Sequence, residues 1–156
     1  MKLLLMLVVF FAYSANAQVK IIDGDSLNVD GKEIRLVNID SPEYFQTCYD
    51  SNNVEYECGY EAYLYLKILV ENGLNQGKDL NCKKVGTDKY NRELSECFIG
   101  KTNLNRLMVK SGHAVSYWED KYKNLENKAK KSKKGVWQGK FMRPELYRVL
   151  KKAKKQ

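Results

Sequence analysis

The stretch VKIIDGDSLNVDGKEIRLVNIDSPE, residues 19–43, decides the fold class of this chain. Val19–Ile22 is mostly apolar and β-branched, and in Ser26–Val29 apolar residues alternate with polar ones; both patterns are typical of strands. Lys32–Ile39 is the third segment that we predict to be a strand. Asp30-Gly31 stands between the second and third segments and favours a two-residue hairpin turn. The sequence therefore predicts strands, including one tight hairpin, at the start of the domain.

Helices and a second strand pair are predicted downstream. Apolar residues from Tyr60 to Asn72 predict a helix that ends at Gly73. The other predicted ranges are Leu80–Val85 and Glu93–Ile99 for two antiparallel strands, and Leu104–Lys110, with Gly112 as its stop, and Tyr122–Lys133 for two helices. Strands first and helices interleaved later indicate an α+β domain, a small antiparallel barrel that carries helices.

The N-terminus has the pattern of a cleaved signal peptide. Lys2 precedes an apolar run from Leu3 to Tyr13, and the small residues Ser14–Ala17 follow. A run of roughly 11 apolar residues is too short for a hydrocarbon core that needs about 20, so an uncleaved anchor is the weaker alternative. We expect a signal peptide at 1–17, a catalytic domain at 18–140 and a basic tail at 141–156, in a monomer that is secreted or periplasmic.

The chain is basic, with 27 lysines and arginines, 19 aspartates and glutamates and a formal charge of +8. Removal of the predicted signal peptide changes this charge only by Lys2. A surface with this charge attracts polyanions, which include nucleic acid, anionic lipid and acidic glycan. The charge alone does not choose among them.

The four cysteines predict disulfides, because the chain is expected to leave the reducing cytosol. Four cysteines allow three connectivities. We favour Cys48 with Cys58 and Cys82 with Cys97, because each pair closes a short loop. A zinc site is the alternative, but the sequence has no C-x-x-C pair and its single histidine, His113, has no partner histidine.

Turn residues in the opening stretch could hold a metal ion and a phosphate. Asp23-Gly24-Asp25 and Asp40-Ser41-Pro42-Glu43 supply carboxylates, which are ligands for Ca²⁺ or Mg²⁺, and Arg35 supplies a guanidinium that can fork onto phosphate oxygens. Ordinary turns and a surface strand position explain the same residues. Because Arg35 and Asp40 have opposite parity on a regular strand, they converge only if the strand bends, bulges or ends before Asp40.

A second polar cluster, Asp88-Lys89-Tyr90-Asn91-Arg92, lies between the two later strands. Lys89 and Arg92 suit contact with phosphate, and the Tyr90 ring is close by. For this loop alone, a solvated hairpin tip is the simpler interpretation. His113 follows a helix-ending glycine and is expected to pack or to lie exposed rather than to catalyse.

Taken in order, these motifs resemble the staphylococcal (micrococcal) nuclease family. The similar segments are VKIIDGDSL, GKEIRLVNIDSPE, CGYEA, DKYNREL, SGHA and KKGVW, which together run through residues 19–137. The resemblance implies a five-stranded β-barrel of the oligonucleotide-binding (OB) fold with three α-helices. It also implies a Ca²⁺-dependent endonuclease that cleaves DNA and RNA to 3′-phosphate products, with one Ca²⁺ ion rather than Mg²⁺.

The resemblance also implies roles by position. The metal ligands of the family match Asp25, Asp40 and the backbone carbonyl of Ser41, and the general base matches Glu43. Its two phosphate-binding arginines match Arg35 and Arg92. The positions that contact substrate match Lys89, Tyr90, and Tyr117 or Trp118.

Three features depart from the family pattern. Ser41 stands where threonine is frequent, and Asn91 replaces a glycine at a position where asparagine best tolerates a left-handed backbone. The cysteines and the loop 44–57 also differ from the cysteine-free prototype. One alternative remains: a barrel that binds nucleic acid without cutting it. Attachment to membranes or cell walls through the lysine-rich tail is compatible with nuclease activity.

Overall fold

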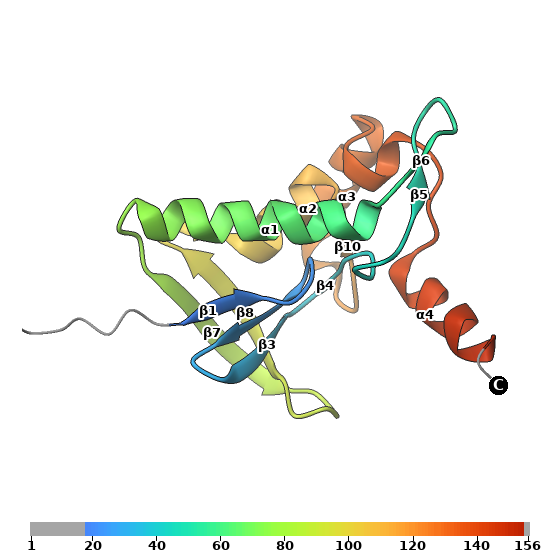
Figure 1. The fold of residues 1–156 in the computed structure, drawn as a ribbon. Coiled ribbons are helices and arrows are strands. Elements are labelled where there is room, and N and C mark those ends of the chain that lie inside the picture. Colours follow the sequence, from blue (N-terminus) through green and yellow to red (C-terminus); the bar gives the residue numbers. More distant parts are fainter. Residues whose placement is uncertain (1–17, 155–156) are drawn as a thin grey trace, which may run out of the picture.

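The computed structural model describes residues 18–154, so the predicted signal peptide at 1–17 lies outside the described residues. Figure 1 shows one long helix above a twisted sheet, with shorter helices beside it. The strands are β1 (Val19–Ile21), β2 (Ser26–Val29), β3 (Lys32–Leu36), β4 (Ile39–Asp40), β5 (Cys48–Tyr49), β6 (Glu55–Tyr56), β7 (Leu80–Thr87), β8 (Glu93–Ile99), β9 (Thr102–Asn103) and β10 (Val115–Ser116). The helices are α1 (Cys58–Asn75), α2 (Leu104–Ser111), α3 (Lys123–Lys131) and α4 (Pro144–Ala153), with 3-10 turns at Asp120–Tyr122 and Gly135–Gln138.

The main sheet has the strand order β1-β2-β3-β8-β7, with β9 paired to β8. The hairpin predicted at Asp30-Gly31 is confirmed, since φ is 50° and 84° at these two residues. Strand β3 pairs in parallel with β8, and Arg35 stands opposite Leu94. Glu93, the first residue of β8, stands opposite Ile34, so the preceding loop, which contains Arg92, ends close to Arg35.

The α+β class is confirmed, whereas the closed five-stranded barrel is not. In the described part of the chain, β1 pairs only with β2 and β7 only with β8, while β4-β10 and β5-β6 form separate two-stranded sheets. Strand β3 ends early because Asn38 has a φ of 63°, a conformation that breaks an extended strand.

The expected count of three helices was wrong, because α4 forms within the segment predicted to be a basic tail. Pro144 stands in the first turn of α4, where its missing N–H costs nothing. Glu145 follows it, next to the positive end of the helix dipole. These local signals favour a helix in this segment even though the segment is rich in lysine. Within residues 18–154, none of the helices combines the length and the apolarity that a membrane span requires.

Helix α1 packs on the main sheet along a buried stripe. Ala62, Leu66 and Val70 repeat at intervals of four residues and have exposed fractions of 0%, 0% and 1%. The predicted helix end at Gly73 is wrong, because α1 continues to Asn75. Gly73 packs against Ile99 so closely that a Cβ atom would overlap the Ile99 side chain. Other core residues are Leu27, Ile34, Leu36, Ile39, Cys97, Leu104, Met108, Val109, Ala114 and Tyr122.

Helix α2 has the predicted start and stop. The Asn103 side chain accepts a hydrogen bond from the Arg106 amide at 2.8 Å, and Gly112 ends the helix with a φ of 79°. Helix α3 buries Glu126 and Ala129, which are one turn apart. Thus the short helices pack through few residues each.

Both predicted disulfides are confirmed. Cys82 and Cys97 are direct partners in the antiparallel pair β7-β8. Cys48 on β5 is joined to Cys58, the first residue of α1. All four cysteines are therefore used, and none is free to bind zinc.

Candidate active site

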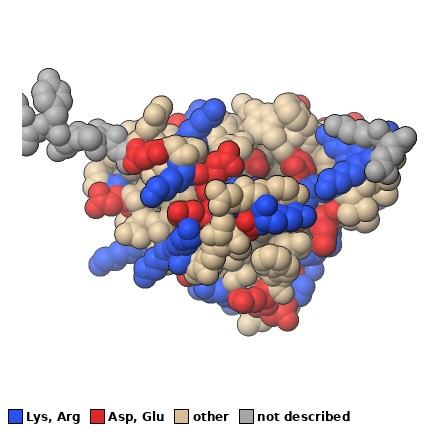
Figure 2. All heavy atoms as spheres, turned by 90° about the horizontal axis from the view of Figure 1, so that it is seen from below, with Lys and Arg blue, Asp and Glu red and all other residues tan. Residues whose placement is uncertain are grey.

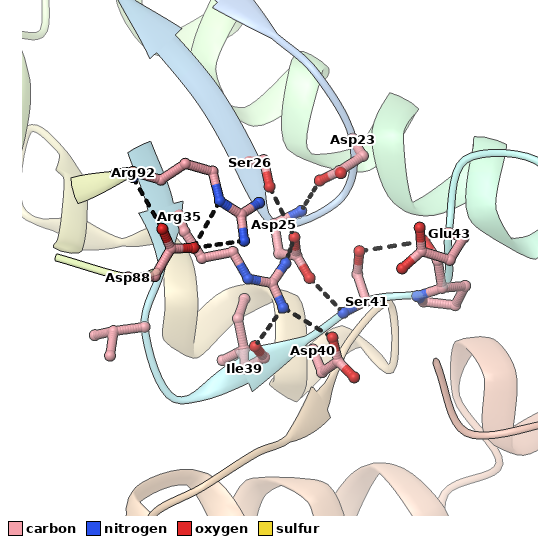
Figure 3. A network of polar contacts seen from close by, with 12 residues as sticks. Asp23, Asp25, Ser26, Arg35, Ile39, Asp40, Ser41, Glu43, Asp88 and Arg92 are labelled. Carbon is pink, nitrogen blue, oxygen red and sulfur yellow. Dashed lines mark hydrogen bonds and ion pairs between the residues drawn. The ribbon is translucent and has the colours of Figure 1, made fainter. Parts of the chain in front are cut away.

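Arg35 and Asp40 meet because the strand is interrupted between them. The chain leaves β3 at Leu36, turns at Asn38 and continues as β4 from Ile39 in a different sheet. Arg35 Nη2 consequently lies 2.8 Å from Asp40 Oδ1. The sequence required the strand to bend, bulge or end before Asp40 for the two side chains to meet. Strand β3 does end before Asp40, and Figure 3 shows the two side chains in contact.

Asp25 joins the same group of side chains from the turn before β2. Its carboxylate forms an ion pair with Arg35 Nη1, and its Oδ2 accepts a hydrogen bond from the Ser41 amide at 2.7 Å. The turn itself is tightened by Asp23, whose Oδ1 accepts from the Asp25 amide at 2.9 Å. Arg35 therefore links the carboxylates of Asp25 and Asp40, which are 1% and 0% exposed.

These residues suit a hard divalent cation by their chemistry. Two buried carboxylates, Asp25 and Asp40, approach one another around Arg35, and Ser41, which follows Asp40 in the chain, is 3% exposed. Carboxylate and carbonyl oxygens are the ligands that Ca²⁺ prefers. Over residues 18–154 no cluster of three or more His, Cys, Asp or Glu side chains has the arrangement of a metal site, so a third ligand would have to come from the backbone or from water.

Burial changes the pKa of two charged groups in the cluster. Burial lowers the pKa of Arg35, and the negative charge of Asp40 opposes this effect. Burial raises the pKa of Asp23, and the positive charge of Arg35 opposes that effect. The site is thus a desolvated region in which each charge depends on its neighbours.

The loop 88–92 is organised by Asp88. Asp88 Oδ1 accepts hydrogen bonds from the amides of Tyr90 and Arg92 at 2.9 Å, and its Oδ2 lies 2.8 Å from Arg92 Nε. Burial alone would raise the pKa of Asp88, but the hydrogen bonds and the charge of Arg92 lower it. Asn91 has a φ of 64°, the left-handed conformation expected at this position.

The predicted substrate residues surround one cavity of about 810 Å³. Figure 2 shows acidic and basic side chains interleaved over the face seen from below. The cavity walls include seven of the predicted site residues: Arg35, Glu43, Lys89, Tyr90, Arg92, Tyr117 and Trp118. Asp25, Asp40 and Ser41 are not among the lining residues, because they are buried beneath Arg35.

Tyr117 and Trp118 form an aromatic wall. Their rings are stacked with centroids 5.9 Å apart, and Trp118 is 74% exposed. The Tyr117 amide donates to the Asn38 carbonyl at 3.0 Å, which fixes this wall beside the strand break. In the loop 88–92, the Tyr90 ring centroid lies 5.1 Å from Lys89 Nζ and 5.7 Å from the Arg92 guanidinium.

Sequence reasoning missed one site residue, Arg148 on α4. Its guanidinium forms hydrogen bonds to Asp40 and to Glu43 and lines the same cavity. Burial alone would lower the pKa of Arg148, but these two carboxylates raise it above its ordinary value. Leu146, Val149 and Leu150 have helical spacing and could have revealed α4, but nothing local in the sequence reveals the contacts.

Comparison with known proteins supports the resemblance. Residues 33–139 match the family described as staphylococcal nuclease homologue. The thermonuclease of Staphylococcus hyicus is 30% identical over 130 residues, which are 76% of this chain and 73% of that protein. The family match, 33–139, includes all of β3 except Lys32, and also β4, the loop 88–92 and α2.

Two other similar proteins are longer. The succinoglycan biosynthesis protein ExoI of Rhizobium meliloti is 32% identical over 125 residues, 77% of this chain and 63% of that protein. Endonuclease YhcR of Bacillus subtilis is 30% identical over 137 residues, 76% of this chain and 11% of that protein. The chain therefore corresponds to only part of each of these two relatives.

Proposed function

The chain belongs to the staphylococcal nuclease family, and from this premise we propose that it is a Ca²⁺-dependent endonuclease that hydrolyses DNA and RNA to 3′-phosphate products. The observation that carries the proposal is the convergence of Asp25, Arg35 and Asp40 behind a cavity that Glu43 and Arg92 also line. A phosphodiester is an anion that repels nucleophiles, so its cleavage needs positive charge and a base in one place. This cavity has both.

Glu43 is the proposed general base. Its side chain is 40% exposed and faces the cavity, where it could take a proton from an attacking water molecule. Asp25, Asp40 and the Ser41 carbonyl would hold one Ca²⁺ ion, which supplies a Lewis acid for a phosphate oxygen. Mg²⁺ is less suited, because it demands a more regular octahedron of ligands.

Arg35 and Arg92 are the proposed phosphate clamps. A guanidinium has five N–H donors. Arg35 contacts Asp25, Ile39 and Asp40 through Nη1 and Nη2, and among residues 18–154 its Nε donor has no hydrogen-bond partner. Arg92 uses Nε and Nη2 on Asp88, which leaves Nη1 for substrate. The acidic partners thus orient both guanidinium groups without using all of their donors.

The remaining lining residues are proposed to bind the nucleic acid. Lys89 and Tyr90 would contact a neighbouring phosphate, and Tyr117 or Trp118 would stack on a base, an interaction of about 1–3 kcal/mol per base. An RNA or a single-stranded DNA chain offers bases free for such stacking. The nuclease names of the relatives and the basic charge of +8 favour these substrates over lipids and glycans.

Export is part of the proposal. Two disulfides suit a protein secreted or periplasmic after removal of residues 1–17. We propose residues 18–140 as the catalytic domain of a monomer. The competing function, a nucleic-acid-binding module without activity, is disfavoured because the cluster of Asp25, Arg35, Asp40, Glu43 and Arg92 is complete.

The test is cleavage of a labelled single-stranded DNA by the protein lacking residues 1–17, with Ca²⁺ or with a chelator. We expect cleavage only with Ca²⁺, products that end in 3′-phosphate, and losses of about 10²–10³-fold in rate for Arg35→Ala and for Glu43→Gln. Arg106→Ala and Glu55→Gln are controls, since both residues are exposed and neither lines the cavity. Cleavage that persists in the chelator or in both variants would contradict the mechanism, and tight binding without cleavage would support the binding module.

A further inference from the structure

Helix α4 places one side chain, Arg148, against both the predicted base and a predicted metal ligand. Arg148 Nη1 lies 2.9 Å from Asp40 Oδ1 and 2.9 Å from Glu43 Oε1, and Nη2 lies 3.0 Å from Asp40 Oδ2. These partners are 108 and 105 residues away in the chain. Resting on the nuclease function proposed above, we propose that Arg148 is a positioning residue that fixes the Glu43 carboxylate relative to Asp40.

The geometry supports positioning rather than simple charge neutralisation. Arg148 donates hydrogen bonds to both carboxylate oxygens of Asp40, which fixes the plane of the Arg148 guanidinium. Its Nη1 atom donates to Glu43 as well. Asp40 is itself held by Arg35 and is fully buried, so it is a rigid reference point. Glu43 is 40% exposed, and within the described residues Arg148 is its one ion-pair partner. Without Arg148, the Glu43 side chain would lose the contact that orients it.

The segment before α4 holds the helix in place independently of Arg148. The Gln46 side chain donates to the Met142 carbonyl at 2.7 Å. Arg143 Nη1 lies 3.1 Å from the buried Glu126, and Arg143 Nη2 donates to the Ser116 carbonyl at 3.2 Å. These contacts anchor the chain just before the first turn of α4. Replacement of Arg148 is therefore expected to disturb the carboxylates more than the fold.

Arg148 is also poorly placed to be a purely structural residue. Its ion pair with Glu43 joins side chains that are 34% and 40% exposed, and a pair this exposed contributes little to stability. The buried Asp40 keeps Arg35 as an ion-pair partner when Arg148 is replaced. The apolar residues Leu146, Val149 and Leu150 of the same helix are 51%, 58% and 42% exposed, so α4 is not held by a buried apolar face. The contacts of Arg148, bidentate to Asp40 and single to Glu43, remain the feature of α4 that needs a functional explanation.

The first experiment separates the turnover number from substrate binding. In Arg148→Ala we expect kcat to fall by roughly 10–100-fold, the effect of misplacing a reacting group by about 1 Å. We expect KM and the midpoint of thermal unfolding to change little. Arg148→Lys should not restore kcat, because an ammonium cannot reproduce the planar fork. Added guanidinium ion should restore part of the kcat of Arg148→Ala and none of that of Glu43→Gln.

Lys151→Ala is the matched control, since it removes one positive charge from the same helix at a residue outside the cavity lining. A kcat of Arg148→Ala equal to that of Lys151→Ala would overturn the proposal. So would an increase in KM with unchanged kcat, which would make Arg148 a substrate-binding cation.

A second readout does not depend on activity. The carboxyl ¹³C resonance of Glu43, recorded without substrate, should shift in Arg148→Ala and stay unchanged in Lys151→Ala. An unchanged Glu43 resonance in Arg148→Ala would overturn the proposal even if cleavage were lost. If the wild-type protein does not cleave nucleic acid, the nuclease function fails, whereas this resonance still reports whether Arg148 holds Glu43.

Discussion

Arg35 Nη2 and Asp40 Oδ1 are 2.8 Å apart, although a continuous strand would direct these two side chains to opposite faces. The contact exists because Asn38 adopts a φ of 63° between β3 and β4. A residue outside the cluster of charged groups thus determines whether that cluster forms.

Replacement of Asn38 tests this dependence. Asn38→Gly should keep the fold and the cleavage activity, because glycine adopts positive φ without strain. Asn38→Val should lose about 1–2 kcal/mol of stability, because a β-branched residue is disfavoured there, and should lose most of its activity. Urea unfolding and the rate of DNA cleavage measure the two effects. A valine variant as stable and active as the glycine variant would show that the turn does not control the site.

The backbone of Glu43 packs closely against Gly59. Gly59, in the first turn of α1, lies against the Glu43 carbonyl so closely that an added Cβ atom would overlap it. We predict that Gly59→Ala displaces Glu43, lowers kcat and costs about 1–3 kcal/mol through overpacking. Gly86→Ala is the matched control, since its Cβ would meet only Leu94, at 3.7 Å. Equal kcat values for the two alanine variants would contradict the prediction.

Asp88 is predicted to orient Arg92 for catalysis. Asp88→Ala removes the acceptor for the Arg92 amide and for its Nε atom, at 2.9 Å and 2.8 Å. Because a misplaced group costs up to about 100-fold in rate, we expect kcat/KM to fall by roughly 10–100-fold, with global stability nearly unchanged. Glu93→Ala is the control, as the Glu93 side chain forms an ion pair at the surface with Lys84 in the same hairpin. An equally small loss of kcat/KM in Asp88→Ala and Glu93→Ala would mean that Arg92 keeps its orientation without Asp88.

Much of the fold was predictable because its signals are local. Asp30-Gly31 specifies a turn by backbone preference alone, and Cys82 with Cys97 flank a hairpin whose strands must pair. The candidate site was predictable because its residues cluster in two short segments, 23–43 and 88–92, and match a family pattern in order.

The rest depended on contacts between distant segments. Gly73 has the local signature of a helix end, but it lies inside α1 because Ile99 occupies the space where a side chain would be. Arg148 belongs to a stretch whose composition suggests a solvated tail. Its role follows only from the placement of α4 beside residues more than 100 positions earlier.

The two disulfides should differ in their effect on activity. Their sequence separations of 10 and 15 residues correspond to roughly 3 kcal/mol each by the chain-entropy estimate. Loss of the Cys48–Cys58 bond should also lower kcat, because Gln46 lies two residues before Cys48. Its side chain accepts a hydrogen bond from the Glu43 amide at 3.2 Å, and its carbonyl accepts one at 3.1 Å from the amide of Gly59, next to Cys58. Paired alanine variants, compared by urea unfolding and by cleavage rate, test this. A larger activity loss in the Cys82–Cys97 pair would refute the assignment.

His113 should make the protein less stable in mild acid. Burial lowers its pKa from 6.5 to about 4, with its ring stacked on Tyr65 at 4.3 Å and its Nδ1 atom 2.9 Å from Ser111 Oγ. Between these two pH values the unfolded chain binds a proton that the folded chain does not bind, so the free energy of unfolding falls as pH decreases from 6.5 to 4. The full shift corresponds to roughly 3 kcal/mol.

The variant His113→Phe isolates this effect, since it keeps an aromatic ring on Tyr65 and removes the titrating group. Carboxylates titrate in both proteins and cancel in the difference. The wild-type free energy of unfolding, measured by urea at several pH values, should therefore fall relative to the variant between pH 6.5 and 4, and the difference should be constant above pH 7. A difference that stays constant over the whole range would mean that His113 can take up a proton in the folded protein, and that the Tyr65 contact does not require a neutral ring.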